Sequence, residues 1–435
     1  MQTDKNTAVR DLMQFLDSSP VNFYAVHTIA ARLDAEGFKR LDPADKWTLE
    51  PGGRYYITKN GSAIFGFVVG AGPASAGYHI ISAHSDSPTM RVKPAAVMVS
   101  DGGVVKLNVE VYGGPILSTW MDRPLSLAGR VALRSDNPLR PRLVLVKWDR
   151  PLLTIPNLAI HFNRQVNDGV RLSPQKDMLP VLGIADDKGT ATQRFMEMIA
   201  EAAGASVEDI LDFDLSLYDT TPACLTGMDS EFVTSGRLDD LSMCHAALDA
   251  LVSTASESVA ATRVMAIFDN EETGSGTKQG AASPVLRSLL ERVTAAKGGS
   301  HEDYLRAVEN SFMVSADNAH AFHPNYGEKY DPTNHPVPGG GPVIKINARC
   351  KYMTDADSAA VFKGICEAAG VPCQYFVNHS DVAGGSTLGN ILTSQIPLRG
   401  VDMGEAIWAM HSVRETASAA DHWHTIRAFR KFFQL

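Results

Sequence analysis

The chain contains the run Arg263-Val264-Met265-Ala266-Ile267-Phe268-Asp269-Asn270-Glu271-Glu272, in which five apolar residues lead directly into a group of acids. A short apolar run is typical of a buried strand, and α/β enzymes commonly place their chemistry just past the end of such a strand. Because Glu271 and Glu272 are adjacent, their side chains point in different directions, which suits one to metal binding and the other to proton transfer. The alternative explanation for these acids is that they stand at a helix N-terminus, where the helix dipole favours negative charge.

Alternating strand and helix patterns surround this run. We predict helices at 240–253, 304–310 and 355–369, and strands at 263–268, 312–315, 342–348 and 374–378. The N-terminal segment is predicted to form helices at 5–17 and 20–36 and strands at 54–57, 63–69 and 78–82. This succession indicates βαβ units and a largely parallel or mixed sheet, so the predicted fold class is α/β.

Residues 88–228 have a different pattern. Short β-like runs at 104–111, 127–133 and 142–147 are separated by Gly, Pro and Asn turns. We predict that residues 88–228 form a β-rich domain inserted into an α/β domain made of residues 1–87 and 229–435.

Four more clusters of acids and histidines follow predicted strands or begin predicted helices: His84-Ser85-Asp86, Arg237-Leu238-Asp239-Asp240, Ser315-Ala316-Asp317-Asn318-Ala319-His320 and Met410-His411-Ser412-Val413-Arg414-Glu415. Each has an ordinary structural explanation, such as a helix cap or a polar turn. Because His84 and Asp86 are two residues apart, they can also be a metal ligand and the carboxylate that orients it. Together the clusters indicate a carboxylate-rich dizinc site.

The overall composition narrows the classes of partner. The 435 residues are 44% hydrophobic, and 40 Lys+Arg against 49 Asp+Glu give a net charge of −9. Without a clustered basic run, this charge argues against nucleic acid or an anionic membrane as a partner. The five cysteines are scattered, so neither a disulfide framework nor a thiolate zinc site is indicated. Since the sequence shows neither a signal-peptide pattern nor an apolar run of about 18 residues, we expect a cytoplasmic protein.

Ordered segments spread over the whole chain share one known pattern: Phe15–Pro20, Pro51–Tyr56, His84–Pro88, Tyr112–Gly114, Trp120–Arg123, Leu125–Arg130, Ile155–His161, Asp269–Glu272, Ser315–Asp317 and Met410–Ser412. In these segments the chain resembles the M18 aminopeptidases, a family that includes aspartyl aminopeptidase. The resemblance implies a zinc-peptidase (phosphorylase/hydrolase-like) α/β/α domain with an inserted β-rich dimerisation domain. It also implies a homo-oligomer, a dodecamer built from dimers.

The same resemblance implies two zinc ions per subunit, with cobalt or manganese as substitutes. One zinc ion would be held by His84, Asp239 and Asp317 and the other by Asp239, Glu272 and His411, so that Asp239 bridges the pair. Oxygen and nitrogen donors of this kind suit zinc or cobalt.

Catalytic and substrate-binding roles are likewise implied by the resemblance. Glu271 matches the family's general base, and Asp86 matches the acid that orients the His84 ligand. His320 and Lys345 match positions close to the substrate, where a lysine is associated with acidic first residues. His161 matches a residue that reaches a neighbouring subunit's active site.

We therefore expect a metalloaminopeptidase that hydrolyses the N-terminal residue, preferably Asp or Glu, from peptides. Three alternatives stay open. The first is a dizinc aminopeptidase with a neutral or broad preference, and the second is a catalytically silent scaffold. The third is a dipeptidase or carboxypeptidase, because metal-assisted hydrolysis is the same at either chain end.

Overall fold

The computed structural model describes residues 4–435, which form two compact units. The first unit comprises the chain up to Asp86, Ala223–Met410 and Glu415–Leu435, and the second comprises Ser87–Pro222 and His411–Arg414. Residues 1–3 of the predicted 1–87 segment lie outside the described residues. Residues 223–228, which the sequence analysis places in the insertion, belong here to the first unit.

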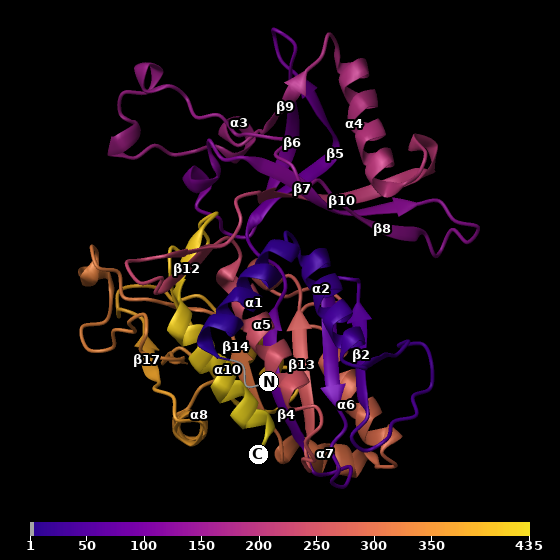
Figure 1. Ribbon diagram of the computed structural model, residues 1–435, viewed down its shortest axis with the longest axis vertical. Helices are drawn as coiled ribbons and strands as arrows, with labels where there is room; N and C mark the ends of the chain where they lie inside the picture. Colours follow the sequence, from indigo (N-terminus) through magenta and orange to yellow (C-terminus); the bar gives the residue numbers. More distant parts are fainter. Residues whose placement is uncertain (1–3) are drawn as a thin grey trace. The chain divides into compact units, whose positions relative to one another are not determined.

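A nine-stranded mixed sheet is the middle layer of the first unit (Figure 1). In spatial order its strands are β1 (Lys39–Arg40), β2 (Arg54–Lys59), β3 (Ala63–Val68), β13 (Thr262–Phe268), β4 (Tyr78–His84), β14 (Phe312–Ala316), β18 (Arg399–Gly404), β16 (Val343–Ile346) and β17 (Gln374–Val377). The four strands β13, β4, β14 and β18 are parallel neighbours. Strands from before and after the second unit thus share one sheet, and the predicted α/β fold class is confirmed.

Strand β13 shows why its sequence is uniformly apolar. All seven of its residues are buried. Successive side chains of a strand point to opposite faces, so Met265 and Ile267 enter the core on one face, whereas Val264 and Phe268 enter the core on the other. A strand covered on both faces cannot alternate apolar with polar residues.

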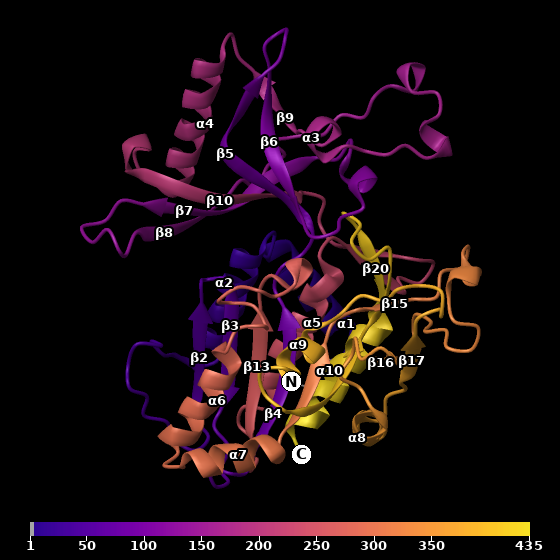
Figure 2. The same cartoon turned by 180° about the vertical axis from the view of Figure 1, so that it is seen from behind.

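Helices cover both faces of the sheet, as the views from opposite sides in Figures 1 and 2 show. One core is formed with α1 (Lys5–Ser18), α2 (Asn22–Ala35), α5 (Leu238–Ser253), α8 (Ala356–Ala369) and α10 (Ala419–Phe433). The other is formed with α6 (Val285–Ala296), α7 (His301–Glu309) and α9 (Leu388–Thr393). The first unit is therefore an α/β/α sandwich.

The parallel strands bring three polar segments to one edge of the sheet. His84 is the last residue of β4, Asp269 follows β13, and Asp317 follows β14. Because parallel strands present their carboxyl ends at the same edge, these residues lie close together although they are far apart in sequence.

A small five-stranded sheet also belongs to the first unit. Its strands, in spatial order, are β11 (Cys224–Thr226), β12 (Phe232–Ser235), β20 (Glu415–Ser418), β19 (Ala406–Trp408) and β15 (Ala319–His320). It connects the segment after Asp317 with the start of α10.

The second unit is built on a six-stranded antiparallel sheet. Its strands, in spatial order, are β8 (Arg142–Lys147), β7 (Leu125–Leu133), β10 (Ile210–Asp219), β5 (Thr89–Val99), β6 (Val104–Tyr112) and β9 (Val181–Ile184). The unit also contains a short helix, α3 (Pro174–Asp177), and a longer one, α4 (Lys188–Ala203), which packs Phe195 and Ile199 into its core. The sheet agrees with the β-rich prediction, whereas α4 was not predicted.

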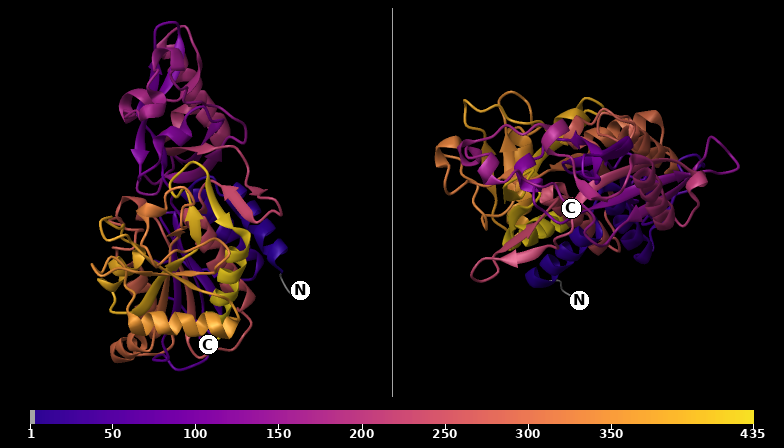
Figure 3. Two further views of the ribbon diagram at one scale, coloured as in Figure 1. Left: turned by 90° about the vertical axis from the view of Figure 1, so that its left-hand side faces the viewer. Right: turned by 90° about the horizontal axis from the view of Figure 1, so that it is seen from above.

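Figure 3 shows the ribbon from the side and from above. Among residues 4–435, none of the helices has the length and apolar character needed to cross a membrane.

Candidate metal centre

His84 ends strand β4 with its side chain almost completely buried. Its Nδ1 lies 3.0 Å from the backbone carbonyl oxygen of Asp86, so Nδ1–H is the donor there and, in the neutral ring, the lone pair is on Nε2. Nε2 points to two carboxylates, at 3.5 Å from Asp239 Oδ1 and 3.9 Å from Asp240 Oδ2. An imidazole fixed in this tautomer is ready to coordinate a metal ion.

Asp239 and Asp240 stand at the beginning of helix α5, where their backbone angles are not helical. The Asp239 N–H donates to Glu415 Oε2 at 3.0 Å, which fixes the backbone of Asp239. Asp240 Oδ2 accepts the backbone N–H of His84 at 3.1 Å. The turn into α5 is thus tied both to β20 and to the end of β4, and both carboxylates are buried.

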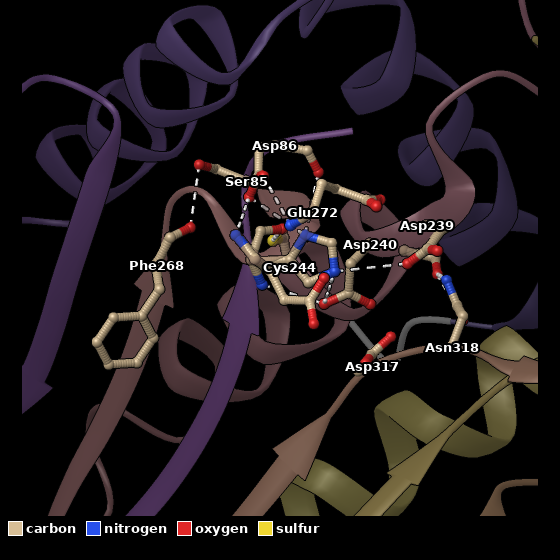
Figure 4. A network of polar contacts seen from close by, with 12 residues as sticks. Ser85, Asp86, Asp239, Asp240, Cys244, Phe268, Glu272, Asp317 and Asn318 are labelled. Atoms are coloured by element: carbon tan, nitrogen blue, oxygen red, sulfur yellow. Dashed lines mark hydrogen bonds and ion pairs between the residues drawn. The ribbon is translucent and has the colours of Figure 1, made fainter. Parts of the chain in front are cut away.

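Asp317 enters the same cluster from the end of β14. Its N–H donates to the carbonyl oxygen of Met403 at 2.9 Å, which continues the pairing of β14 with β18. One atom each from His84, Asp239, Asp240 and Asp317 lies within 4.8 Å of the others. Figure 4 shows the three carboxylates gathered in this cluster.

Asp86 holds the backbone of both glutamates. Its Oδ1 accepts the Glu271 N–H at 3.1 Å, and its Oδ2 accepts the Glu272 N–H at 3.2 Å. Its Oδ1 also lies 3.4 Å from His84 Nδ1. The carboxylate of Asp86 therefore connects the histidine to the short 3-10 helix Glu271–Thr273. Glu271 and Glu272 form a second ligand-like group with His84.

The crowding of carboxylates changes their acidity. Burial raises the pKa of Glu271 to about 8, and the carboxylates of Asp317, Asp86 and Asp239 add to this rise while His84 opposes it. Burial also raises the pKa of Asp317, against the effect of its neighbour Lys345.

The protein itself supplies little positive charge to balance these groups. Burial alone would lower the pKa of His84, but Asp240, Asp239 and Asp86 outweigh it and raise this pKa well above its usual value. Lys345 on β16 is 3% exposed, and its Nζ lies 3.5 Å from Asp317 Oδ2.

This chemistry fits a divalent metal. Buried carboxylates are costly unless a cation compensates them, and an imidazole with several carboxylate oxygens is a common donor set for zinc. Asp240 Oδ1 is buried and makes no hydrogen bond among residues 4–435. A cation bound between His84, Asp239 and Asp317 would supply the missing positive charge.

The other predicted site residues occupy different parts of the chain. His320 is an exposed residue of β15, with its ring centroid 5.6 Å from that of Phe376. His161 is exposed in the 3-10 helix Ile160–Phe162 of the second unit. His411 also belongs to the second unit, where its Nδ1 lies 3.1 Å from the carbonyl oxygen of Gly114.

Two groups near the cluster were not singled out by the sequence analysis. Glu415 binds the backbone of Asp239, and the amide of Asn318 donates to the Leu238 carbonyl oxygen at 2.7 Å. Both residues lie within sequence segments that were recognised as polar clusters. Their partners, however, are backbone atoms of a distant segment, which residue type alone cannot reveal.

Comparisons with known proteins identify the family. The model of the family described as "Aminopeptidase I zinc metalloprotease (M18)" matches residues 15–433. The chain belongs to the M18 family. It is 48% identical over 426 residues to a probable M18 family aminopeptidase 2 from Clostridium novyi, with 98% of both chains covered. A protein of the same description from Pseudomonas entomophila is 41% identical over 426 residues, with 97% of both chains covered.

Solved structures agree with this assignment. A cryo-EM structure of a complex of Ape4 and Nbr1 contains a chain that is 34% identical, with a TM-score of 0.95, and the match covers 99% of this chain and 86% of that one. The M18 member described here therefore belongs to a family of zinc-dependent hydrolases that act as aminopeptidases.

The position of Asp86 in this M18 fold leads to a prediction for Asp86→Asn. An asparagine can accept only one of the two N–H groups, because its amide NH₂ would face the other donor. We expect kcat to fall about 10–100-fold, as is usual when a group that orients metal ligands is lost. Steady-state kinetics with the zinc content measured on the same sample would check this. The matched control is Asp381→Asn, whose side chain is 92% exposed and which should keep normal activity; wild-type kcat in Asp86→Asn would contradict the role.

Proposed function

We propose that this M18 protein removes the N-terminal residue, preferably Asp or Glu, from peptides, using two zinc ions per subunit. The observation that carries the proposal is the buried cluster of His84 with Asp239, Asp240 and Asp317, beside Glu271 and Glu272. The same residues give the cluster both metal donors and a carboxylate suited to proton transfer.

The proposed ligands are His84, Asp239 and Asp317 for one zinc ion and Asp239, Glu272 and His411 for the other. The distances within the His84 cluster support the first set. The second set rests on family membership and on residue type. Zinc bound there would polarise the scissile carbonyl and make a water molecule more acidic.

Glu271 is the proposed general base. Its carboxylate takes a proton from the attacking water as the new C–O bond forms, and it delivers that proton to the amine nitrogen as the C–N bond breaks. Asp86 keeps Glu271 in place through the hydrogen bond to its N–H. The backbone of Glu272 is fixed by the other oxygen of Asp86, and its side chain has a different role, as a proposed zinc ligand, because adjacent side chains diverge.

Lys345 is the proposed basis of the acidic preference. Its ammonium group lies beside Asp317, at the edge of the proposed metal site, and 5.7 Å from the ring centroid of Tyr352. The side-chain carboxylate of an N-terminal Asp or Glu could form a charge-assisted hydrogen bond with it. His320, on the strand that follows Asp317, is the second proposed substrate contact.

We further propose that the protein acts as a homo-oligomer, a dodecamer built from dimers in which His161 contributes to a neighbouring subunit's site. A solved structure of the S. cerevisiae mApe1 dodecamer supports the proposal, with a TM-score of 0.85, 27% identity and 98% of this chain covered. The proposed domain ranges, 1–87 with 229–435 and 88–228, and the cytoplasmic location stay predictions.

The removal of Glu271 should separate metal binding from turnover. In Glu271→Gln the side chain keeps its size but cannot accept the proton, so we expect zinc content to stay normal while kcat falls about 10²–10⁴-fold. Elemental analysis and initial rates on one sample would measure both. Glu309→Gln, the same change at an exposed position of helix α7, is the control. Normal turnover in Glu271→Gln would remove this residue from its role.

The proposed specificity is tested with matched aspartyl, glutamyl and leucyl peptides, each free and N-acetylated. Rates are measured before chelation, after chelation and after zinc or cobalt is restored. Cleavage that returns with metal and is confined to free acidic N-termini is the expected result. Faster leucyl cleavage would favour the neutral aminopeptidase. Cleavage of acetylated peptides would favour a carboxypeptidase-type activity. No turnover with any metal would favour the silent scaffold.

In the same assay, Lys345→Leu should reduce aspartyl cleavage at least about tenfold more than leucyl cleavage, because only the acidic substrate loses a charged partner. Lys351→Leu is the control, since Lys351 is exposed and close in sequence. An equal loss for both substrates would show that Lys345 does not select the first residue.

A further inference from the structure

Four titratable side chains of the first unit, Asp11, His245, His422 and Glu405, form a continuous chain of polar contacts. Asp11 Oδ2 lies 2.8 Å from His245 Nε2, His245 Nδ1 lies 2.9 Å from His422 Nε2, and His422 Nδ1 lies 2.9 Å from Glu405 Oε1. Asp11, His245 and His422 come from α1, α5 and α10, and Glu405 is the residue between β18 and β19. None of them is a proposed metal ligand or substrate contact.

Only one end of this chain reaches the surface. The side chain of Asp11 is 42% exposed and binds Arg32 of helix α2 at 2.8 Å, whereas His245, His422 and Glu405 are at most 1% exposed. The ring of Phe15 lies 5.6 Å from that of His245, and Glu405 Oε2 is buried without a hydrogen bond among residues 4–435. The two histidines are therefore shielded from water.

A count of protons shows that the four side chains can form all three hydrogen bonds in one state of charge. Three hydrogen bonds in a row need three protons. Asp11 is ionised, since His245 and Arg32 outweigh its burial and lower its pKa. His245 then donates from Nε2 and accepts at Nδ1 from His422 Nε2–H. The third proton lies in the hydrogen bond between His422 Nδ1 and Glu405 Oε1.

A fourth proton has no good position. Placed on His245 Nδ1, it faces the N–H of His422. If the proton of His422 is instead on Nδ1, so that Nε2 can accept from His245, the extra proton ends on Glu405 Oε2. This oxygen has no acceptor among the described residues. Either arrangement also adds a buried positive charge close to Arg32, without a new counter-charge.

The other charged groups around the chain do not remove this penalty. Burial, His422 and Arg32 together lower the pKa of His245 against the opposing effect of Asp11. On α10, Asp421 and His424 interact electrostatically with Glu405. Asp421 already accepts the N–H groups of Gly339 and Gly341 at 2.7 Å each.

We propose that Asp11, His245, His422 and Glu405 form an acid-sensitive latch that fastens helix α1 to α5 and α10. Near neutral pH the three-proton chain holds α1 in place. Opening of α1 exposes His245 to water, so the open state takes up the proton that the closed state rejects. Because the folded pKa of His245 is lowered, the latch is intact above the ordinary imidazole pKa of about 6.5 and weakens as the pH falls below it.

The latch is tested by amide hydrogen exchange of α1 in the zinc-loaded full chain at pH 7.5 and pH 5.5. The intrinsic exchange rate at each pH is used to convert the measured rate of each amide into a protection factor. Uptake of one proton on opening increases the open population by up to about tenfold per pH unit. We therefore expect protection of Lys5–Ser18 to fall several-fold to about tenfold in the wild type, while helix α6 on the opposite face of the sheet stays protected. Zinc content measured at both pH values separates this effect from metal loss.

His245→Gln is the decisive variant, because a glutamine can donate to Asp11 and accept from His422 but does not titrate. Its α1 protection should change less than about twofold over the same pH range. His79→Gln is the matched control: His79 is a half-buried histidine, whose pKa burial lowers to about 4, but it has no place in the latch, so this variant should behave as the wild type.

Two results would overturn the latch. One is α1 protection in the wild type that is the same at pH 7.5 and pH 5.5, and the other is a loss of α1 protection at pH 5.5 in His245→Gln as large as in the wild type. If His245→Gln does not fold, Asp11→Asn at the exposed end replaces it. Loss of the carboxylate should then reduce α1 protection at pH 7.5 already, and unchanged protection would overturn the latch. Because the four residues are not proposed ligands, failure here leaves the proposed peptidase function untouched.

Discussion

The repulsion among carboxylates buried at one edge of the sheet is the constraint on which the rest of the structure depends. Asp239, Asp240 and Asp317 meet around the single imidazole of His84, and Glu271 and Glu272 adjoin them. Lys345 is a buried ammonium group at this cluster, and it touches only one side of it. Such an arrangement is stable in a folded protein only if cations compensate it, which is why its chemistry leads to a metal centre.

The scaffold holds these groups in place by fixing the backbone that carries them. Parallel strands deliver His84 and Asp317, and hydrogen bonds from backbone N–H groups fix Asp239, Glu271 and Glu272. A site mounted on strand ends and helix starts is held precisely by the scaffold, so little reorganisation is needed when a metal binds. The same sandwich accommodates the buried histidine chain, which connects α1, α5 and α10.

Sequence patterns predicted several strands that are buried on both faces, but not the buried strand β18. The apolar run of β13 and the strands that carry His84 and Asp317 were found within a few residues of their observed bounds. Helix α10 was not predicted, although His422, Ile426, Phe429 and Phe433 recur at helical spacing and are buried. Strand β11 had no detectable signal, because all three of its residues are exposed and only its pairing with β12 defines it.

The candidate site was predictable as a set of residue types but not as a geometry. The clusters at strand ends contained the candidate donors, and the resemblance to the M18 family gave each of them an expected role. The sequence could not show that the Asp86 carboxylate binds two backbone N–H groups, or that Lys345 is buried beside Asp317, because both depend on partners distant in sequence. The roles of His161 and His411 also stay predictions, since they depend on residues of the second unit.

The most direct test of this account is anomalous X-ray diffraction at the zinc edge from crystals of the zinc-loaded protein. The account predicts two anomalous peaks per subunit, one coordinated by His84 and Asp317 and the other by Glu272 and His411, with Asp239 between them. A single peak, or peaks away from these residues, would contradict the dinuclear site from which the proposed chemistry follows.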